Sequence, residues 1–135
     1  MIKSASLGKE LEITIKNKIG VLADISKILS DRGINIDSVV GYVVDGSAKL
    51  MLVTGDDVRA KETLEKTGYK PIKENEVILA VLENKPGALK SLTAKLASAN
   101  IDIKYTYGTT CPTGCPATIV LSTSSNEKAL VALKK

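Results

Sequence analysis

A repeat in the sequence constrains the fold more than any other feature. When the chain is shifted by 67 positions, Asn17–Leu22 lies over Asn84–Leu89, and the similarity continues without a gap for some twenty residues. The shift then becomes 69, because the second copy carries a two-residue insertion at Cys111–Pro116. Self-similarity at a fixed spacing indicates that one structural unit occurs twice. The chain is therefore predicted to contain two copies of a unit of about 60–65 residues.

Hydrophobic periodicity predicts the elements of each copy. Leu11–Ile15 alternates as a half-buried strand does, and Val77–Leu82 is an apolar run suited to a fully buried strand. Each is followed by apolar residues at helical spacing, which end at Gly33 and Asn100. The remaining predictions are strands over 34–44, 48–54 and 69–74, a hairpin turn at Asp45–Gly46, and second helices capped by Asp56 and by Ser124 with Glu127.

This order of elements predicts an α+β fold, the ferredoxin-like βαββαβ motif repeated twice, with sheet order 4-1-3-2 and the helices on one face. We expect one domain over residues 1–75, including an N-terminal extension at 1–10, and a second domain over 76–135. The second copy is expected to lack its last strand, which leaves Val77–Leu82 with an uncovered edge. Met1–Leu7 could add a strand there, within the chain or across a dimer; the alternative is a tail absent from this sequence.

Composition excludes several classes of function. The chain has no His, which removes the commonest general base and the Ser-His and Cys-His nucleophile pairs, so we expect no enzyme and no cofactor. It has no Phe or Trp and only four Tyr, too few for the stacking surfaces of a single-strand nucleic-acid binder. The net charge of +4 comes from scattered lysines, typical of a solvated surface. We therefore expect no nucleic-acid partner.

The chain is expected to be cytoplasmic, with no membrane partner. No apolar run approaches the roughly 18 residues of a membrane span. The opening residues Met1–Ser6 lack the apolar stretch of a secretory signal, and two cysteines fit a reducing compartment.

Two short loops carry the clearest binding signal. The patterns Asn17-x-x-Gly20 and Asn84-x-x-Gly87 each fall between the first strand and the first helix of a copy. The start of a helix exposes free N–H groups and the positive end of the dipole, which can hold a carboxylate. Glycine allows close approach to the backbone, and an Asn amide can serve both charged groups of an amino acid. The alternative is that Asn and Gly only form a turn and a cap.

These loops, followed by an amphipathic helix and then by Gly33–Ile36 or Asn100–Ile103, resemble the ACT domain, a small-molecule regulatory module of amino-acid metabolism. The resemblance covers nearly the whole chain, twice. The chain is also similar to proteins made only of tandem ACT domains, whose second copy often carries a strand like Ile103–Tyr107. The resemblance implies a non-catalytic, amino-acid-binding regulatory protein that forms a homodimer. The alternative is a ligand-free interaction subunit that docks on a metabolic enzyme through a sheet edge.

The resemblance also implies a set of ligand-binding residues. In the serine-regulated ACT domain of phosphoglycerate dehydrogenase, two asparagines hold the amino acid between neighbouring domains; these positions fall here on Asn17 and Asn35, and on Asn84 and Asp102. A carboxylate at Asp102 would attract the ligand ammonium but repel its carboxylate, and the histidine before that loop has no counterpart, so serine specificity does not carry over. The expected ligand-binding residues are Asn17, Ile19, Gly20, Val21, Asn35, Asn84, Pro86, Gly87, Ala88 and Asp102.

Other functions of ferredoxin-like folds need residues that this chain lacks. RNA-recognition domains require aromatic residues on the central strands, where this chain has Ile13 and Leu50. Copper carriers place Cys in the loop at 17–20, and acylphosphatases place Arg there. A ligand-binding module is therefore favoured over a pure interaction subunit.

Cys111 and Cys115 are the remaining candidates for chemistry. Thiols four residues apart could ligate a soft metal or close a small disulfide. Metal sites take three or four ligands, and the chain has no His and no further Cys. Free thiols are the favoured expectation, followed by a redox-dependent disulfide and then by a metal.

Overall fold

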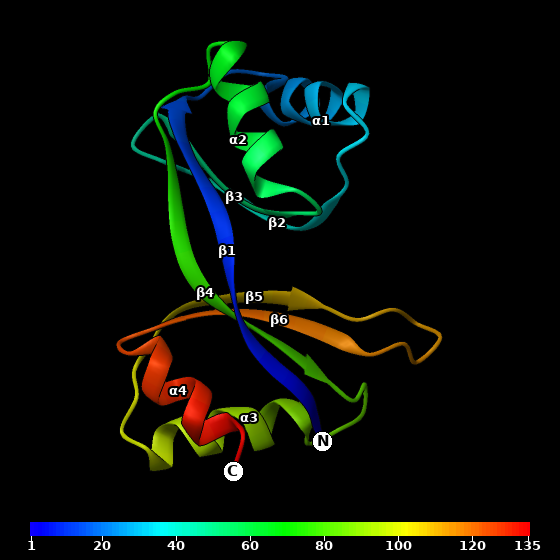
Figure 1. The fold of residues 1–135 in the computed structure, drawn as a ribbon, viewed down its shortest axis with the longest axis vertical. Coiled ribbons are helices and arrows are strands. Elements are labelled where there is room, and N and C mark those ends of the chain that lie inside the picture. The colour runs from blue at the N-terminus through cyan, green and yellow to red at the C-terminus, as the bar shows by residue number, and fades with distance from the viewer. The chain divides into compact units, whose positions relative to one another are not determined.

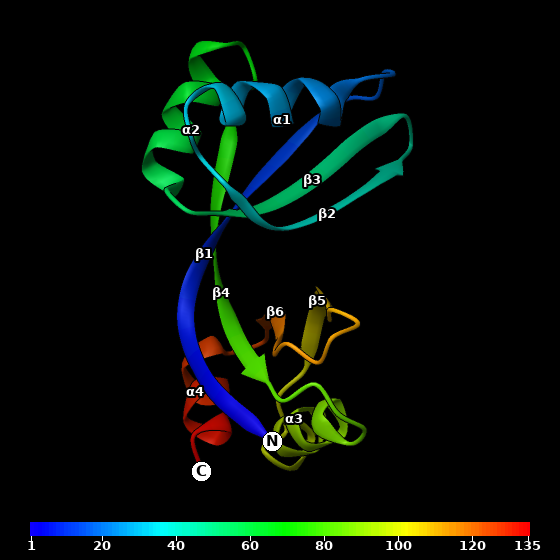
Figure 2. The same cartoon turned by 90° about the vertical axis from the view of Figure 1, so that its right-hand side faces the viewer.

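The computed structural model describes residues 1–135 and has an α+β fold, as predicted. The chain divides into two compact units (Figures 1 and 2). The inserted unit is Lys9–Asn75, and the split unit consists of Met1–Gly8 together with Glu76–Lys135. The elements are β1 Ile2–Lys16, α1 Val21–Asp31, β2 Ile36–Val44, β3 Ser47–Thr54, α2 Asp57–Lys66, β4 Ile72–Leu82, α3 Ala88–Ser98, β5 Ile103–Thr109, β6 Ala117–Thr123 and α4 Asn126–Leu133.

The inserted unit has the strand order β2-β3-β1-β4, which is the ferredoxin-like order expected from the sequence. Strands β1 and β3 are antiparallel, with Ile13 opposite Leu50. Helices α1 and α2 lie on the same face of these strands (Figure 1). The core between helices and strands contains Leu11, Ile13, Val21, Ile25, Leu29, Ile34, Leu50, Leu52, Ala60, Leu64, Tyr69 and Ile72.

Local signals in the sequence place the ends of these elements. The hairpin turn between β2 and β3 has Asp45 at φ 50° and Gly46 at φ 78°, the two positive angles that a tight hairpin turn of this type requires. The Asp56 side chain accepts the N–H of Arg59 at 3.1 Å and caps α2. Both predictions are confirmed.

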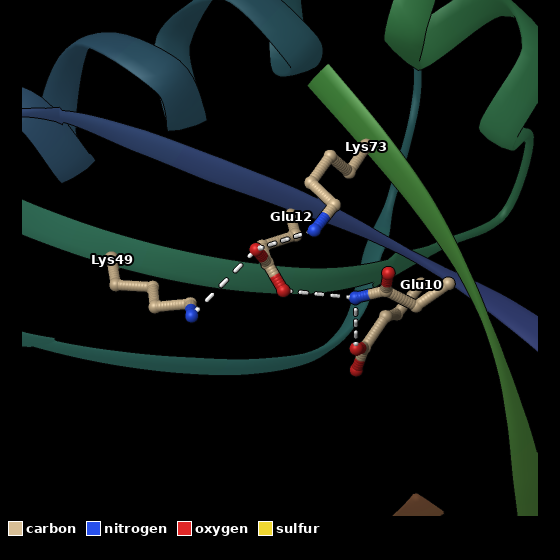
Figure 3. A network of polar contacts seen from close by, with 5 residues as sticks. Glu10, Glu12, Lys49 and Lys73 are labelled. Carbon is tan, nitrogen blue, oxygen red and sulfur yellow. Dashed lines mark hydrogen bonds and ion pairs between the residues drawn. The ribbon is translucent and has the colours of Figure 1, made fainter. Parts of the chain in front are cut away.

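The face of the inserted unit's sheet away from the helices carries a polar network (Figure 3). Glu10 is fully buried, and Asn75 Nδ2 donates to Glu10 Oε2 at 2.9 Å and to Glu12 Oε1 at 3.0 Å. Lys49 Nζ and Lys73 Nζ lie 3.7 Å and 3.9 Å from Glu12 Oε2. One amide therefore bridges two carboxylates, and two lysines offset their charge.

The split unit contains the strand that its own repeat lacks. Its strand order is β1-β4-β6-β5, and the β1 residues that belong to it are the N-terminal ones. Ile2 and Ala5 pack against the split unit's core, and Glu83 N–H donates to the Met1 carbonyl at 2.8 Å. Residues 1–8 thus lie with the second repeat instead of extending the first. The apolar edge of β4 is covered within the chain, the first of the two arrangements expected for Met1–Leu7.

The strands are also longer than the sequence predicted. Leu11–Ile15 lies in the second half of β1, and residues 72–74 of the stretch predicted at 69–74 join Val77–Leu82 in one strand, β4. Strands β1 and β4 both contribute residues to both units. The expected connection near Asn75 is therefore extended strand and not a loop.

The cap of α4 differs by one residue from the prediction. Ser125, and not Ser124, accepts the N–H of Lys128, at 3.4 Å. Ser124 Oγ instead accepts the N–H of Asp102 at 3.1 Å. Two serines in succession offer the same cap, and the strand pairing that precedes them decides which one is used.

No helix in the structure is both long enough and apolar enough to cross a membrane.

Candidate functional site

The loop that precedes α1 is open to a ligand. Gly20 is the residue before the helix, with φ 92° and ψ 3°, and no side chain caps the helix there. A Cβ placed on Gly20 would meet no atom within 4 Å. No side chain therefore caps the first N–H groups of α1, and the space at the Gly20 side-chain position is open. Ile19 beside it is fully exposed, whereas Val21 is buried.

A cleft of about 610 Å³ lies beside this loop in the inserted unit. It is bounded by the end of β1, the first turn of α1 and the turn between α2 and β4. Of the predicted ligand-binding residues only Asn17 lines it; the full lining is Ile15, Lys16, Asn17, Lys18, Asp24, Thr67, Gly68 and Tyr69. Cationic and anionic side chains therefore face the same cleft.

Tyr69 and Asp24 form a contact in this cleft that sequence reasoning missed. The Tyr69 hydroxyl donates a short hydrogen bond to Asp24 Oδ2, while the ring belongs to the core. The hydrogen bond to Asp24, together with burial and the charge of Asp24, raises the pKa of Tyr69 to about 12. The available signal was an aromatic residue directly after the helix-ending Gly68, where its ring returns to the core.

Replacing Tyr69 with Phe is expected to lower the free energy of unfolding by about 1–2 kcal/mol near neutral pH, since the hydrogen bond to Asp24 is lost. The raised pKa means that the folded state holds the phenolic proton more tightly than the unfolded chain does. This stabilisation is complete below about pH 10 and disappears as the pH rises to about 12, so the difference between wild type and variant should close over that window. Denaturant unfolding at several pH values measures it.

Tyr42→Phe is the matched control, because the Tyr42 side chain is exposed. It should change stability little at any pH. A wild-type ultraviolet titration in which all four tyrosines ionise together near pH 10 would contradict the prediction for Tyr69.

Asn35 lies away from this cleft. It follows the other end of α1, a helix of 11 residues, or about 16 Å. Its Nδ2 donates to Asp37 Oδ1 at 2.7 Å, and its carbonyl accepts the N–H of Gly55 at 2.9 Å. Asn35 lines a separate cleft of about 380 Å³, formed by Ser26, Ser30, Gly33, Ile34, Asn35 and Ile36. Within one unit the structure does not bring Asn17 and Asn35 together.

The corresponding loop of the split unit is more closely packed. Gly87 precedes α3 with φ 91°, but a Cβ placed there would lie 3.4 Å from Met1 Cε. Asn84 Nδ2 donates to the Cys111 carbonyl at 3.0 Å. Ala88 is buried, whereas Pro86, between Asn84 and Ala88 in the chain, is exposed. The two loops therefore share their backbone geometry but differ in what surrounds them.

Asp102 in the split unit occupies the place that Asn35 has in the inserted unit. The Asp102 carbonyl accepts the N–H of Ser124 at 2.9 Å, just as the Asn35 carbonyl accepts that of Gly55. This equivalence supports the alignment on which both site predictions depend.

The two cysteines are paired in the structure. Cys111 and Cys115 form a disulfide, and their Cα atoms are 5.7 Å apart, a distance typical of such bonds. The favoured expectation was free thiols, whereas the structure has the disulfide. Residues 110–116 connect β5 to β6, where the second repeat has its insertion, and the disulfide closes residues 111–115 of this turn.

Several solved structures share the fold of this chain. A protein of Bacteroides thetaiotaomicron superposes with a TM-score of 0.87 at 24% identity, over 96% of this chain and 88% of that one. The regulatory subunits of aspartate kinase from Thermus thermophilus and Thermus flavus give TM-scores of 0.69 and 0.63 at 17% and 18% identity, each over 98% of this chain and 96% of theirs. No curated protein sequence matches significantly.

At these identities the structural matches show a shared fold. The sequence itself is more specific, because residues 9–67, nearly the whole inserted unit, match the ACT domain family. The inserted unit therefore carries an ACT domain, in residues 9–67.

Proposed function

We propose that this chain is a non-catalytic, cytoplasmic regulatory protein of amino-acid metabolism that binds an amino acid in the cleft beside Asn17. The observation that carries the proposal is this cleft of about 610 Å³, which is bordered by the first turn of α1 through Asp24 and is also lined by Lys16 and Lys18, so that it presents both charge signs. The Thermus proteins are regulatory subunits of an enzyme of amino-acid metabolism, and this chain spans almost their whole length. In the same way, this chain would regulate an enzyme and would not catalyse a reaction itself.

The charges around the cleft fit the two charged groups of an amino acid. The ligand carboxylate would accept hydrogen bonds from the N–H groups of Gly20 and Val21, assisted by the dipole of α1. The ammonium would face the Asp24 carboxylate and the Asn17 amide oxygen. Ile19, fully exposed beside Gly20, would cover the aliphatic part of the ligand.

We further infer that the split unit is a second ACT domain, which makes the chain a tandem protein. Its candidate ligand-binding residues are Asn84, Pro86, Gly87, Ala88 and Asp102. Binding there would be weaker than at Asn17, since Met1 lies next to the side-chain position of Gly87 and the Asn84 amide already donates to the Cys111 carbonyl.

A homodimer would supply the residue that the first site lacks. Asn35 cannot reach the cleft of its own unit, so it would contact a ligand only across an interface with a second copy. Strand β2, which follows Asn35 directly, is the edge of its sheet. Its exposed apolar side chains are Val39, Tyr42, Val43 and Val44. An apolar edge of this kind favours strand pairing between copies.

The same edge supports the second candidate function, a ligand-free interaction subunit that docks on a metabolic enzyme through β2. The two functions differ in one measurable property, which is whether a free amino acid stabilises the protein. A thermal-shift screen of the twenty amino acids decides between them, because a ligand at about 100 times its Kd adds roughly 2.7 kcal/mol.

Gly20→Val is expected to abolish the stabilisation by the ligand that this screen identifies. A β-branched residue at φ 92° is strained and would force the loop away from its binding conformation. Gly114→Val is the matched control, because Gly114 also has a left-handed φ, 85°, and open space around it but lies in the other unit. Both variants should lose about 1–2 kcal/mol of stability, and only Gly20→Val should lose the response. An unchanged response in Gly20→Val would rule the site out.

A further inference from the structure

The disulfide turn between β5 and β6 has no part in the proposed function. Pro112 to Pro116 are exposed, and Cys111 is half-buried beneath them. No third His, Cys, Asp or Glu side chain lies with the two cysteines, so the pair lacks the ligand number of an ordinary zinc site. The chemistry left for two neighbouring, accessible sulfurs is reversible oxidation.

The two sulfurs have different surroundings. The N–H of Cys115 donates to Cys111 Sγ at 2.9 Å, and the Thr113 hydroxyl lies 3.4 Å from the same sulfur. These donors favour negative charge on Cys111 Sγ, which makes it the better leaving group in thiol–disulfide exchange. Cys115 is the more exposed of the two and is therefore the sulfur that a reductant attacks.

The backbone of Cys111 connects this turn to the loop that precedes α3. The Cys111 carbonyl accepts the Nδ2 of Asn84 at 3.0 Å and the N–H of Gly114 at 3.4 Å. The second bond closes the disulfide turn, and the first holds the Asn84 side chain. The closed turn thus contains the carbonyl that holds the Asn84 side chain, and this bond joins the turn to a loop that is also held by the bond from Ala88 N–H to the Lys85 carbonyl at 3.2 Å.

We propose that Cys111 and Cys115 form a reversible thiol–disulfide site whose oxidation state sets the order of the Asn84–Gly87 loop through the hydrogen bond from Asn84 to the Cys111 carbonyl. In the oxidised form the closed turn holds the carbonyl and the loop is ordered. In the reduced form the turn opens, the carbonyl moves, and the loop becomes mobile.

The exchange partner is a dithiol reductant. One of its thiolates attacks Cys115 Sγ, the bond between the protein sulfurs breaks, and its electron pair goes to Cys111 Sγ, which then takes up a proton. The second thiol of the reductant then attacks the reductant's own sulfur in the mixed disulfide. Cys115 leaves as a thiolate and takes up the proton that this thiol gives up. In sum, the protein disulfide gains two electrons and two protons, and the dithiol is oxidised to a cyclic disulfide.

The inserted unit provides an internal control. There the N–H of Asn17 donates to the Gly46 carbonyl at 2.9 Å, so the equivalent loop is also held by the neighbouring hairpin. That hairpin turn is Asp45–Gly46 and contains no cysteine. Reduction should therefore leave the Asn17–Gly20 loop unchanged.

The test is amide hydrogen exchange and NMR on the full chain, oxidised by oxidised glutathione and then reduced by dithiothreitol, with the thiols counted by mass after alkylation. We expect exchange in residues 85–88 to rise about tenfold on reduction, the Asn84 side-chain amide signal to shift, and residues 17–20 to stay unchanged. The double variant Cys111→Ser, Cys115→Ser should show the exchange rates of the reduced protein, and dithiothreitol should not change them.

Asn84→Ala separates the sulfur chemistry from its effect on the loop. This variant should still gain and lose the disulfide, while its loop stays mobile in both states. Two results would overturn the proposal: thiols that stay free under excess oxidised glutathione, or residues 85–88 that exchange equally in the verified oxidised and reduced proteins. Neither readout needs a bound amino acid, so the outcome is independent of the proposed function.

Discussion

Deleting residues 1–7 is expected to unfold the split unit while the inserted unit keeps its fold. The deletion removes the strand that covers the edge of β4 and takes Ile2 and Ala5 away from the core of Glu76–Lys135. The loss of one strand and its apolar contacts should cost on the order of 3–5 kcal/mol, which is a large part of the stability of a unit this size. NMR or hydrogen exchange measured separately for the two units would show the difference.

A substitution pair provides the control for this deletion. Ala5→Asp places a charge against the core and should reproduce part of the loss, whereas Ser4→Asp, on the exposed side of the same strand, should be nearly neutral. A split unit that stays folded without residues 1–7 would contradict the proposed role of the strand. Sedimentation of both proteins would also test the homodimer, which should survive the deletion if β2 forms the interface.

Replacing Asn75 with Asp is expected to destabilise the inserted unit by about 2–4 kcal/mol at neutral pH. The Asn75 amide donates to both Glu10 and Glu12, and Glu10 is fully buried (Figure 3). An aspartate there removes both donated hydrogen bonds and adds a third carboxylate beside Glu10 and Glu12, while Lys49 and Lys73 pair with Glu12. Denaturant unfolding monitored by circular dichroism measures the loss.

The pH dependence distinguishes charge repulsion from a loss of packing. Protonating the introduced aspartate relieves the repulsion, so the deficit of Asn75→Asp should shrink as the pH falls. Asn17→Asp makes the same change of charge at an exposed position of the same unit and should shift stability by less than about 0.5 kcal/mol. A deficit that is independent of pH would point to packing alone.

Most of the fold could be predicted because its signals are local. The spacing of Val21, Ile25 and Leu29 determines the buried face of α1. Asp45–Gly46 provides the two residues with positive φ that the turn between β2 and β3 needs. The path of the N-terminal residues could not be predicted with the same certainty. Strand pairing between residues near 1 and near 83 depends on contacts far apart in the sequence, and no local pattern encodes them.

The candidate site was predictable to a smaller extent. The Asn-x-x-Gly pattern located the open loop at Gly20, because a left-handed residue before a helix has a recognisable sequence. It did not indicate the Tyr69–Asp24 contact, which joins residues 45 positions apart. It also could not show that Met1 would lie next to the side-chain position of Gly87 while that of Gly20 stays open, since this difference arises only from tertiary packing.

The division of one folded unit between the two ends of the sequence has a consequence for biosynthesis. Residues 9–75 leave the ribosome as an unbroken stretch and can fold during translation. The strand at 2–8 is synthesised before this stretch but stays unpaired until β4, its neighbour in the sheet of the split unit, has been made. Residues 2–8 are therefore an exposed strand edge while residues 9–75 are made, and polar residues such as Lys3, Ser4 and Ser6 help to keep them soluble during that interval.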